Sequence, residues 1–459
     1  MTMILMIMMI ATETALVIGD TTDAKGLTKA GHSKRRLAVD AAEIGIYLLM
    51  LLFPHIDLSF RFRGLVLMLI VRLAAAAVSF LINRKNEKHK KMPSVVIGAL
   101  THMMLLFFAL IPAFIFKDYT GRPVTGAHEV AQADAILIDS SRTETFEDDG
   151  SYREVPVHFF YPSDAVSIDN GSLPLVIFSH GAFGWYQSNT STYMELASNG
   201  YVVASLDHPY HAMYTKDTSG KTIIVDNGFM QTAMTYGSDD SAEYDEAAAF
   251  EVEQAWMELR TADMSFVIDT LKKAADDHTF DSSWYFEGDA QDKIGTVMAM
   301  TDTTKIGLMG HSMGGATAVT VGRRGDISAV IDLDGTMLGE ETGIDNGRIV
   351  VNDEPYPVPL LNIDNEDHHN SRKELREMGD TYSNNVILDN AVCGYDTYIK
   401  GTKHMNYTDL PLFSPFLAKG LGTGSIDPEE CIDKTNALVL SFFDAYLKDS
   451  GTFAVQESY

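Results

Sequence analysis

The sequence contains few cysteines for its length. Its 459 residues include two, Cys393 and Cys431, and neither belongs to a Cys/His cluster with the spacing of a zinc site. A structural metal is therefore not expected. The two cysteines either form one disulfide, if they lie outside the cytoplasm, or stay as separate thiols.

Positive charge is also scarce, except near the N-terminus. The chain has 35 Lys and Arg against 63 Asp and Glu, a formal net charge of −28. Residues 1–116 hold 13 basic and 7 acidic side chains, a net charge of +6, so the remainder has 22 basic and 56 acidic side chains, a net charge of −34. Because so acidic a surface repels a nucleic-acid backbone, no nucleic-acid partner is expected.

The first quarter of the chain contains three long apolar stretches, at residues 44–54, 64–82 and 94–116. The last of them has no formal charge over about the twenty residues that a bilayer requires. We therefore expect residues 1–116 to form a membrane region with about three transmembrane helices. The first ten residues are apolar, but no positive segment precedes them, so a cleaved signal peptide is not expected.

Basic residues flank these stretches unevenly. They are concentrated at 29–36, before the first stretch, and at 84–91, between the second and third, and they are sparser in the other loops. The positive-inside rule then predicts a cytoplasmic N-terminus. Three crossings would place everything after Phe116 outside the cell, so we expect a multi-pass membrane protein with an extracellular soluble domain.

Beyond residue 134, short apolar runs alternate with longer helical ones, which indicates an α/β fold with a mostly parallel, buried sheet. Residues 117–150 are expected to be a linker and the start of the soluble domain, and residues 151–459 the domain itself. A helical insertion is predicted at 214–304, with an amphipathic helix at 243–277. The segments around that helix are long enough to cap a site.

The segment GHSMG at residues 310–314 matches the pattern G-x-S-x-G and lies between a predicted strand and a helix-compatible run. In this setting Ser312 lies on a tight turn that exposes a nucleophile. The helix that follows directs a backbone N–H and a partial positive charge toward a developing oxyanion. The sequence FSHGAFGW, at residues 178–185, offers the N–H of Ala182 as a second donor, and His180 is expected to order this loop.

A serine nucleophile needs a histidine base and a carboxylate that orients it. His404 is the best-placed histidine because it follows the last predicted strand, whereas His368 and His369 follow the strand before it. Asp334 and Asp367 each lie in the exit of a predicted strand. Chain order does not choose between these two carboxylates.

Four segments, in this order, resemble the platelet-activating factor acetylhydrolase family of plasma type, a branch of the α/β-hydrolases: PLVIFSHGAFGWYQSNTSTYMELASNGYVVASLDHP, GLMGHSMGGATAV, VIDLDGTM and IKGTKHMNYTDL. The resemblance covers about residues 155–447 and implies an α/β-hydrolase fold. It implies Ser312 as the nucleophile, Asp334 as the acid and His404 as the base. It also implies the backbone N–H groups of Ala182 and Met313 as the oxyanion hole. The sequence departs from the family at Met313, where an aromatic residue is usual, and in its N-terminal spans, which the secreted members lack.

The expected function is a membrane-anchored serine ester hydrolase, of carboxylesterase or acetylhydrolase-like lipase type, that forms an acyl-enzyme. Its partners would be an ester or lipid substrate and the surrounding membrane lipids, and its chemistry requires no metal or organic cofactor. Three alternatives stay open. They are an acyltransferase with the same triad, a cutinase-like polyester hydrolase, which shares GHSMGG, and a membrane protein whose hydrolase domain only binds partners.

Overall fold

The computed structural model describes residues 1–22, 26–164, 169–237 and 245–459. The chain divides into two compact units. One contains residues 1–120 and 412–417, and the other contains residues 121–411 and 418–459. Each unit is described separately.

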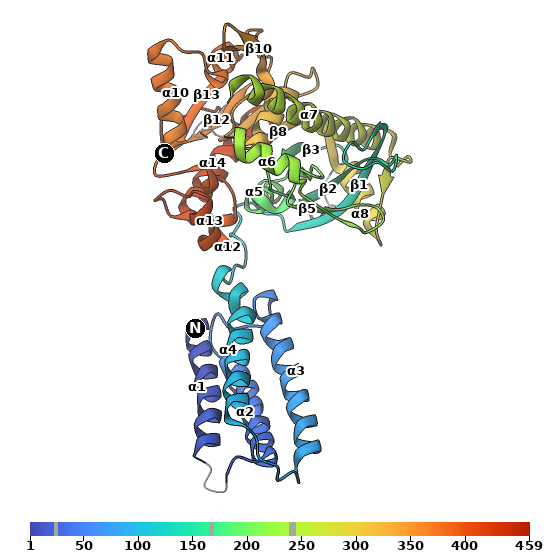
Figure 1. The fold of residues 1–459 in the computed structure, drawn as a ribbon. Coiled ribbons are helices and arrows are strands. Elements are labelled where there is room, and N and C mark those ends of the chain that lie inside the picture. Colours follow the sequence, from blue (N-terminus) through green and yellow to red (C-terminus); the bar gives the residue numbers. More distant parts are fainter. Residues whose placement is uncertain (23–25, 165–168, 238–244) are drawn as a thin grey trace. The chain divides into compact units, whose positions relative to one another are not determined.

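The first unit contains four long helices: α1 (Thr2–Thr21), α2 (Lys29–Met50), α3 (Phe60–Asn83) and α4 (Met92–Ile115) (Figure 1). Within the described ranges three of them, α1, α3 and α4, are long and apolar enough to cross a membrane. The stretches expected at 64–82 and 94–116 fall on α3 and α4. The position expected for the first span, 44–54, was wrong. Those residues fall at the end of α2, and the third apolar helix is α1.

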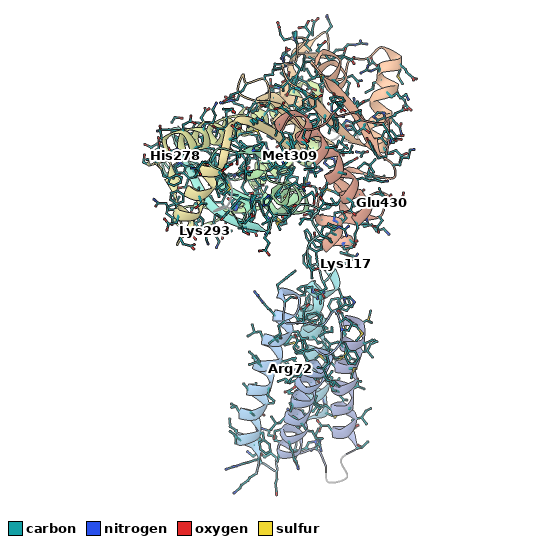
Figure 2. All side chains as sticks on the ribbon, turned by 180° about the vertical axis from the view of Figure 1, so that it is seen from behind. Arg72, Lys117, His278, Lys293, Met309 and Glu430 are labelled. Atoms are coloured by element: carbon teal, nitrogen blue, oxygen red, sulfur yellow. The ribbon has the colours of Figure 1, made fainter. Side chains whose placement is uncertain are left out.

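Helix α2 is less apolar than these three helices, because several of its side chains are charged and contact the neighbouring helices. Arg36 donates hydrogen bonds of 2.7 Å to Glu13 of α1. Arg72 of α3, which lies between the two ends of this group of helices in Figure 2, donates to Asp40 of α2 at 2.7 Å and lies 2.8 Å from Glu43. All five side chains are buried. These ion pairs compensate the cost of placing charge inside the helical unit.

The second unit is built on a sheet that, in the described residues, has nine strands in the order β13-β12-β9-β8-β3-β4-β2-β1-β7. The six strands from β13 to β4 are all paired in parallel, and β2, β1 and β7 add an antiparallel edge. The expected mostly parallel sheet is thus present. The bounds are β1 (Val130–Thr143), β2 (Tyr152–Pro162), β3 (Leu173–Ser179), β4 (Val202–Leu206), β7 (Trp284–Tyr285), β8 (Thr301–His311), β9 (Ala329–Leu333), β12 (Leu360–Asn365) and β13 (Gly394–Ile399).

Helices cover both faces of this sheet. The principal ones are α5 (Thr190–Ser198), α7 (Glu246–Asp277), α8 (Ala290–Met300), α9 (Met313–Val321), α10 (Glu366–Met378), α11 (Ser383–Asn390) and α14 (Pro428–Leu447). Along β3, Leu175 and Ile177 join the core under α7, α8 and α9, whereas Val176 and Phe178 join the core under α5 and α14. This alternation follows from the two-residue period of a strand.

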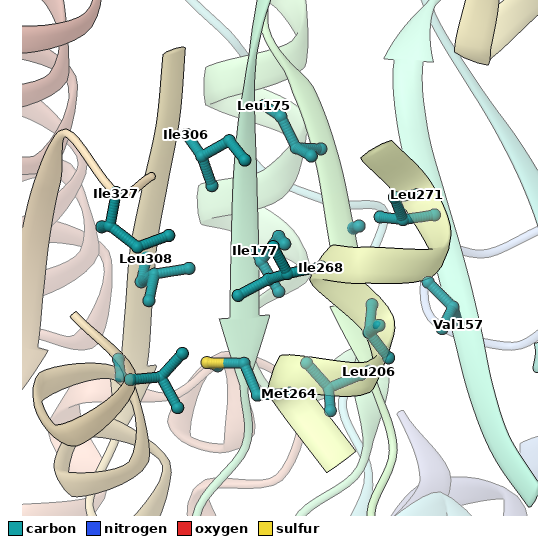
Figure 3. Close-up of a cluster of buried hydrophobic side chains, with 14 of the residues drawn as sticks. Val157, Leu175, Ile177, Leu206, Met264, Ile268, Leu271, Ile306, Leu308 and Ile327 are labelled. Carbon is teal, nitrogen blue, oxygen red and sulfur yellow. The ribbon is translucent and has the colours of Figure 1, made fainter. Parts of the chain in front are cut away.

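Figure 3 shows how α7 packs on the sheet. Its side chains Met264, Ile268 and Leu271 lie against strand residues that include Ile177 and Leu206. The helix predicted at 243–277 is therefore confirmed from Glu246 onward, while the start of that range lies outside the described residues. Burial of each such aliphatic side chain contributes about 1.5–3 kcal/mol to folding.

The segment between β4 and β8 covers nearly all of the range in which an insertion is expected, 214–304. It begins with a hairpin of β5 (Tyr214–Lys216) and β6 (Thr222–Ile224), continues through α6 (Asn227–Tyr236) and α7, and ends with α8. A second hairpin, β10 (Glu341–Asp345) with β11 (Arg348–Val351), follows β9. The remaining helices are the short α12 (Leu410–Phe413) and α13 (Pro415–Leu421). Cys393 and Cys431 are free thiols, so the disulfide left open above is absent from the structure.

Candidate active site

Ser312 lies on the tight turn between β8 and α9. Its backbone has φ 57° and ψ −129°, a conformation that L-residues rarely adopt and that costs about 1–3 kcal/mol. The turn is held from both sides, because the Ser312 N–H donates to the carbonyl of Leu333 at 2.9 Å and its carbonyl accepts from Ala316 at 3.1 Å. The strand–turn–helix context predicted for GHSMG is therefore confirmed.

The glycines after Ser312 are required by close approaches to neighbouring atoms. A Cβ on Gly314 would lie 2.0 Å from the carbonyl oxygen of Ser179, at the end of β3. A Cβ on Gly315 would lie 1.8 Å from a carboxylate oxygen of Asp332. Both distances are far shorter than any real contact, so a larger residue at either position would push the turn away from the sheet.

His404 and Asp334 meet at the same edge of the sheet. Asp334 directly follows β9, and His404 begins the short helix η4 (His404–Tyr407), after β13. The Nδ1 of His404 lies 2.7 Å from Oδ2 of Asp334. The imidazole is 43% exposed while the carboxylate is fully buried, which leaves the histidine accessible from solvent and the acid behind it.

Asp334 is surrounded by donors. Asn365 gives its backbone N–H at 2.7 Å and its side-chain amide at 2.8 Å. Burial alone would favour the neutral acid, but the hydrogen bonds from His368 and His404 outweigh it and hold the pKa of Asp334 below its ordinary value. The acid is therefore ionised throughout the neutral range.

The other candidate for this role, Asp367, and the two neighbouring aspartates Asp364 and Asp332 are placed differently. Asp367 has a side chain that is 72% exposed, and its ion-pair partner is Lys403, 3.6 Å away. No contact in the described residues joins it to His404. Asp364 is buried and accepts from Arg372 at 2.7 Å, and Asp332 accepts from the Gly335 N–H at 3.0 Å. The structure thus brings Asp334, and not Asp367, to His404.

A second histidine, His368, also reaches Asp334, and sequence reasoning did not foresee this. Its Nδ1 lies 3.3 Å from Oδ1 of Asp334, and its Nε2 lies 2.9 Å from the hydroxyl of Tyr382. Burial opposes its charged form, but the carboxylate of Asp364 and the hydrogen bond to Asp334 raise the pKa of His368 well above its ordinary value. The available signal was the run of acids and histidines in DNEDHH, directly after a predicted strand.

The loop after β3 lies against the nucleophile turn. An ideal Cβ on Gly181 would be 3.2 Å from the Cβ of Ser312, so the backbone at 181–182 is next to the serine. His180 is buried, and its Nδ1 lies 2.6 Å from the Gly181 carbonyl oxygen. Burial, reinforced by the positive charge of Arg260, lowers the pKa of His180 to about 3. This neutral ring orders the loop, as expected from the sequence.

Arg260, from α7, fixes the same loop from the other side. Its guanidinium is fully buried and donates to the carbonyl of His180 at 2.5 Å and to that of Gly181 at 3.5 Å. Because C=O and N–H point in opposite directions across a trans peptide, holding the Gly181 carbonyl also fixes the direction of the Ala182 N–H. Burial lowers the pKa of Arg260 to about 9, so it is charged at neutral pH.

Behind this loop lies another hydrogen-bonded series of serine, histidine and aspartate. The Oγ of Ser179 lies 2.9 Å from Nε2 of His208, whose Nδ1 lies 3.0 Å from Asp263. All three side chains are fully buried, and Arg153 donates to Asp263 at 2.7 Å. Since no substrate reaches a buried serine, we interpret this series as support for the loop.

Apolar side chains of the insertion pack beside the nucleophile turn. Phe229 of α6 and both Trp256 and Met257 of α7 form a cluster with Met313 and Ala316. Partly buried residues of the loop after β3 join it, namely Ala182 and Phe183. The insertion therefore borders the backbone N–H groups expected to form the oxyanion hole.

Acidic and histidine side chains near Asp334 lie close enough together to suggest a metal site, in particular Asp364 with Asp396 and His369. Arg372 donates to Asp364 at 2.7 Å and to Asp396 at 2.6 Å. This internal cation already occupies the space between the two carboxylates, so we identify neither of them as a metal ligand.

Comparison with known proteins agrees with this architecture. Residues 159–457 match the family model "Platelet-activating factor acetylhydrolase, isoform II". A platelet-activating factor acetylhydrolase from Cavia porcellus is 24% identical over 294 residues, which is 60% of this chain and 57% of the relative, so the match spans little more than half of that protein. A solved structure, a ferulic acid esterase from Streptomyces cinnamoneus, is 20% identical with a TM-score of 0.52, over 72% of this chain and 93% of its own. The α/β-hydrolase fold is thus confirmed, and the chain belongs to the platelet-activating factor acetylhydrolase, isoform II family.

Proposed function

We propose that this protein is a serine ester hydrolase in which Ser312, His404 and Asp334 form the catalytic triad. The observation that carries the proposal is the 2.7 Å contact between His404 and Asp334, at the sheet edge where Ser312 occupies its strained turn. A buried, ionised acid paired with a partly exposed histidine is the arrangement that activates a serine nucleophile.

In the proposed reaction the Ser312 Oγ attacks the ester carbonyl carbon, and Nε2 of His404 takes the serine proton. Asp334 holds the Nδ1–H of His404 and stabilises the imidazolium. The oxyanion accepts hydrogen bonds from the N–H groups of Ala182 and Met313. The intermediate collapses to an acyl-enzyme as the alcohol leaves with the proton from His404. Water, deprotonated by His404, then releases the acid.

An apolar ester is the substrate class that we propose. The cluster around Phe229, Trp256 and Met257 borders Met313, so the acyl or alcohol group of a bound ester would meet apolar side chains there. The name of the relative from Cavia porcellus, an acetylhydrolase, favours a lipid acetyl ester as the first compound to test.

We also propose that the first unit anchors the enzyme in a membrane with its catalytic domain outside. The two basic segments lie at one end of this unit, since the Lys29 N–H donates to Lys88 and the Lys90 N–H donates to Leu27, both at 2.9 Å. If that end faces the cytoplasm, as the positive-inside rule requires, α4 runs to the opposite side of the membrane. An impermeant amine label added to intact cells should then modify the catalytic domain, and protection of the domain until lysis would contradict this orientation.

The test of the reaction compares two serines. Ser312→Ala should abolish hydrolysis of p-nitrophenyl esters and labelling by a fluorophosphonate probe, with an unchanged melting temperature. Ser179→Ala is the matched control, because Ser179 has its own histidine partner but is buried, and it should retain labelling at Ser312. Full turnover by the Ser312 variant would refute the proposal. Adding an alcohol acceptor to the same assay separates hydrolysis from acyl transfer. Comparing polyester with phospholipid substrates separates the two substrate classes.

A further inference from the structure

A second imidazole contacts the acid of the proposed triad. His368, in the first turn of α10, places its Nδ1 3.3 Å from Oδ1 of Asp334, while His404 lies 2.7 Å from Oδ2 of the same carboxylate. The two histidines therefore share one aspartate. Only 17% of the His368 side chain is exposed, compared with 43% for His404, so His368 faces the protein interior.

The surroundings of His368 are rich in carboxylates. Besides Asp334, Asp364 of β12 lies 3.5 Å from its Nδ1, and Asp332 of β9 is buried nearby. Arg372 of α10 is engaged with Asp364 and Asp396. Asp334, in contrast, has no Lys or Arg among its contacts in the described residues, so a positive charge beside it must come from a histidine.

The hydrogen bonds of His368 accommodate a doubly protonated ring. Its Nδ1–H points to Asp334, and its Nε2 lies 2.9 Å from the hydroxyl oxygen of Tyr382, which can accept a hydrogen bond. The Tyr382 hydroxyl in turn lies 3.0 Å from Oγ1 of Thr336 and can donate to it. Each ring nitrogen therefore has an acceptor. Burial opposes this charge, but the carboxylate of Asp364 and the hydrogen bond to Asp334 outweigh it and keep the pKa of His368 well above its ordinary value.

We propose that His368 is a positioning residue that stays positively charged and, through the shared carboxylate of Asp334, sets the pH at which His404 becomes available as a base. The inference rests on the proposed function. A fixed positive charge beside Asp334 offsets part of the negative charge that would otherwise favour the protonated form of His404. Removing that charge should therefore displace the acidic limb of the rate profile to higher pH.

The groups facing His404 allow this effect to be isolated. Asp334 lies 2.7 Å from its Nδ1, and the ring centroid of His311 lies 4.6 Å from that of His404. Burial, followed by the influence of His404, lowers the pKa of His311 to about 3, so His311 carries no charge in the working range. Two described residues in direct contact with Asp334 can carry a positive charge, His368 and His404. Replacing His368 therefore removes one of these charges and leaves His404 unchanged.

The experiment measures kcat/KM for a p-nitrophenyl ester against pH in the full-length protein. His368→Asn removes the charge, and the acidic limb of the profile should move to higher pH by about one unit, the size expected for a unit charge sharing a carboxylate in a partly buried site. Tyr382→Phe is milder, since it keeps the imidazole and removes the acceptor for Nε2–H together with the bond to Thr336, and it should move the limb in the same direction by less. The high-pH plateau should change little in either variant.

His369→Asn is the matched control. His369 is the next residue in the same helix and is also buried, but it stacks on Tyr398 with ring centroids 4.6 Å apart and does not contact Asp334. The acidic limb of the His369→Asn rate profile should coincide with that of the wild type. A purely structural role for His368 would lower activity uniformly at all pH values, with no displacement of the limb.

The outcomes are distinguishable. Displaced limbs in His368→Asn and Tyr382→Phe, with none in His369→Asn, support the inference. If the acidic limb does not move in either His368→Asn or Tyr382→Phe, the inference about His368 is overturned, and the proposed triad is unaffected. Turnover that survives Ser312→Ala overturns the proposed function itself.

Discussion

Replacing Asp334 by asparagine is expected to lower kcat by about 10⁴-fold, or about 5.4 kcal/mol of activation free energy, the size seen when other serine hydrolases lose the triad acid. The cause can be derived from the contacts. Both the backbone N–H and the side-chain amide of Asn365 donate to Oδ1 of Asp334, at 2.7 and 3.0 Å, while His404 lies at Oδ2. An asparagine at 334 satisfies these donors with its carbonyl oxygen and must then turn its NH₂ toward Nδ1 of His404. The imidazole is forced to carry its proton on Nε2 and cannot accept one from Ser312.

The assay compares kcat and KM of this variant with those of Asp367→Asn on a p-nitrophenyl ester near neutral pH. Asp367 is largely exposed and pairs only loosely with Lys403, at 3.6 Å, so its replacement should change kcat by less than about twofold. KM should be similar in both variants, because neither carboxylate contacts the acyl group. A large loss of kcat in Asp367→Asn together with near-normal turnover in Asp334→Asn would refute the assignment of the acid.

Two further predictions concern buried charges. Arg260→Met should lower kcat by about 10–10³-fold, because the carbonyls of His180 and Gly181 lose their donor and the Ala182 N–H is no longer held toward the oxyanion. The measurement is turnover per active site, with the number of active sites determined by fluorophosphonate labelling. An unchanged kcat would show that the loop keeps its shape without Arg260. For Asp409, burial raises the pKa to about 7, so the folded state holds a proton that the unfolded state has lost above about pH 4. Stability from this group is therefore lost as pH rises from about 4 to 7, and Asp409→Asn should raise the melting temperature more at pH 8 than at pH 5. An equal change at both pH values would contradict the reasoning.

The sequence predicted the parts of the fold that depend on local pattern. The strands around 155–162, 173–181 and 201–209 and the long helix of the insertion correspond to β2, β3, β4 and α7. It did not predict β1, which lies within residues 117–150, the segment expected to be a linker and the start of the soluble domain. That strand pairs with β2 over most of its length, and its alternating burial reflects a single covered face. Such a strand looks like a polar linker until its partner is known.

Helix α1 was missed for a related reason. The run of apolar residues at its start breaks at Thr12-Glu13-Thr14, so the uninterrupted apolar part is short and a longer stretch carries a charge. In the folded unit Glu13 receives hydrogen bonds from Arg36, and the helix continues to Thr21. A charge that would end an isolated apolar helix is tolerated when another helix neutralises it, and the partner is 23 residues away in sequence.

The choice between Asp334 and Asp367 illustrates what chain order cannot supply. Both follow predicted strands, and the order of nucleophile, acid and base is satisfied by either. The difference arises because β9 and β12 are neighbours in parallel register, with Leu333 opposite Ile363, so that Asp334 and Asn365 leave the sheet side by side and Asn365 caps α10. Asp367, two residues farther along, is carried outward by the helix.

The same register explains why His368 could not be foreseen. Asn365 accepts the N–H of His368 at 3.0 Å, which starts α10 at the point where the His368 ring turns back to the carboxylate of Asp334. One residue more or less between β12 and α10 would rotate this side chain by about 100° around the helix and remove it from the acid. The electrostatic setting of the proposed base therefore depends on a helix cap and a strand register, and neither is encoded in the spacing of the triad residues. If that argument is correct, inserting one alanine between Asn365 and Glu366 should displace the acidic limb of the rate profile as His368→Asn does, while His404 and Asp334 stay in contact.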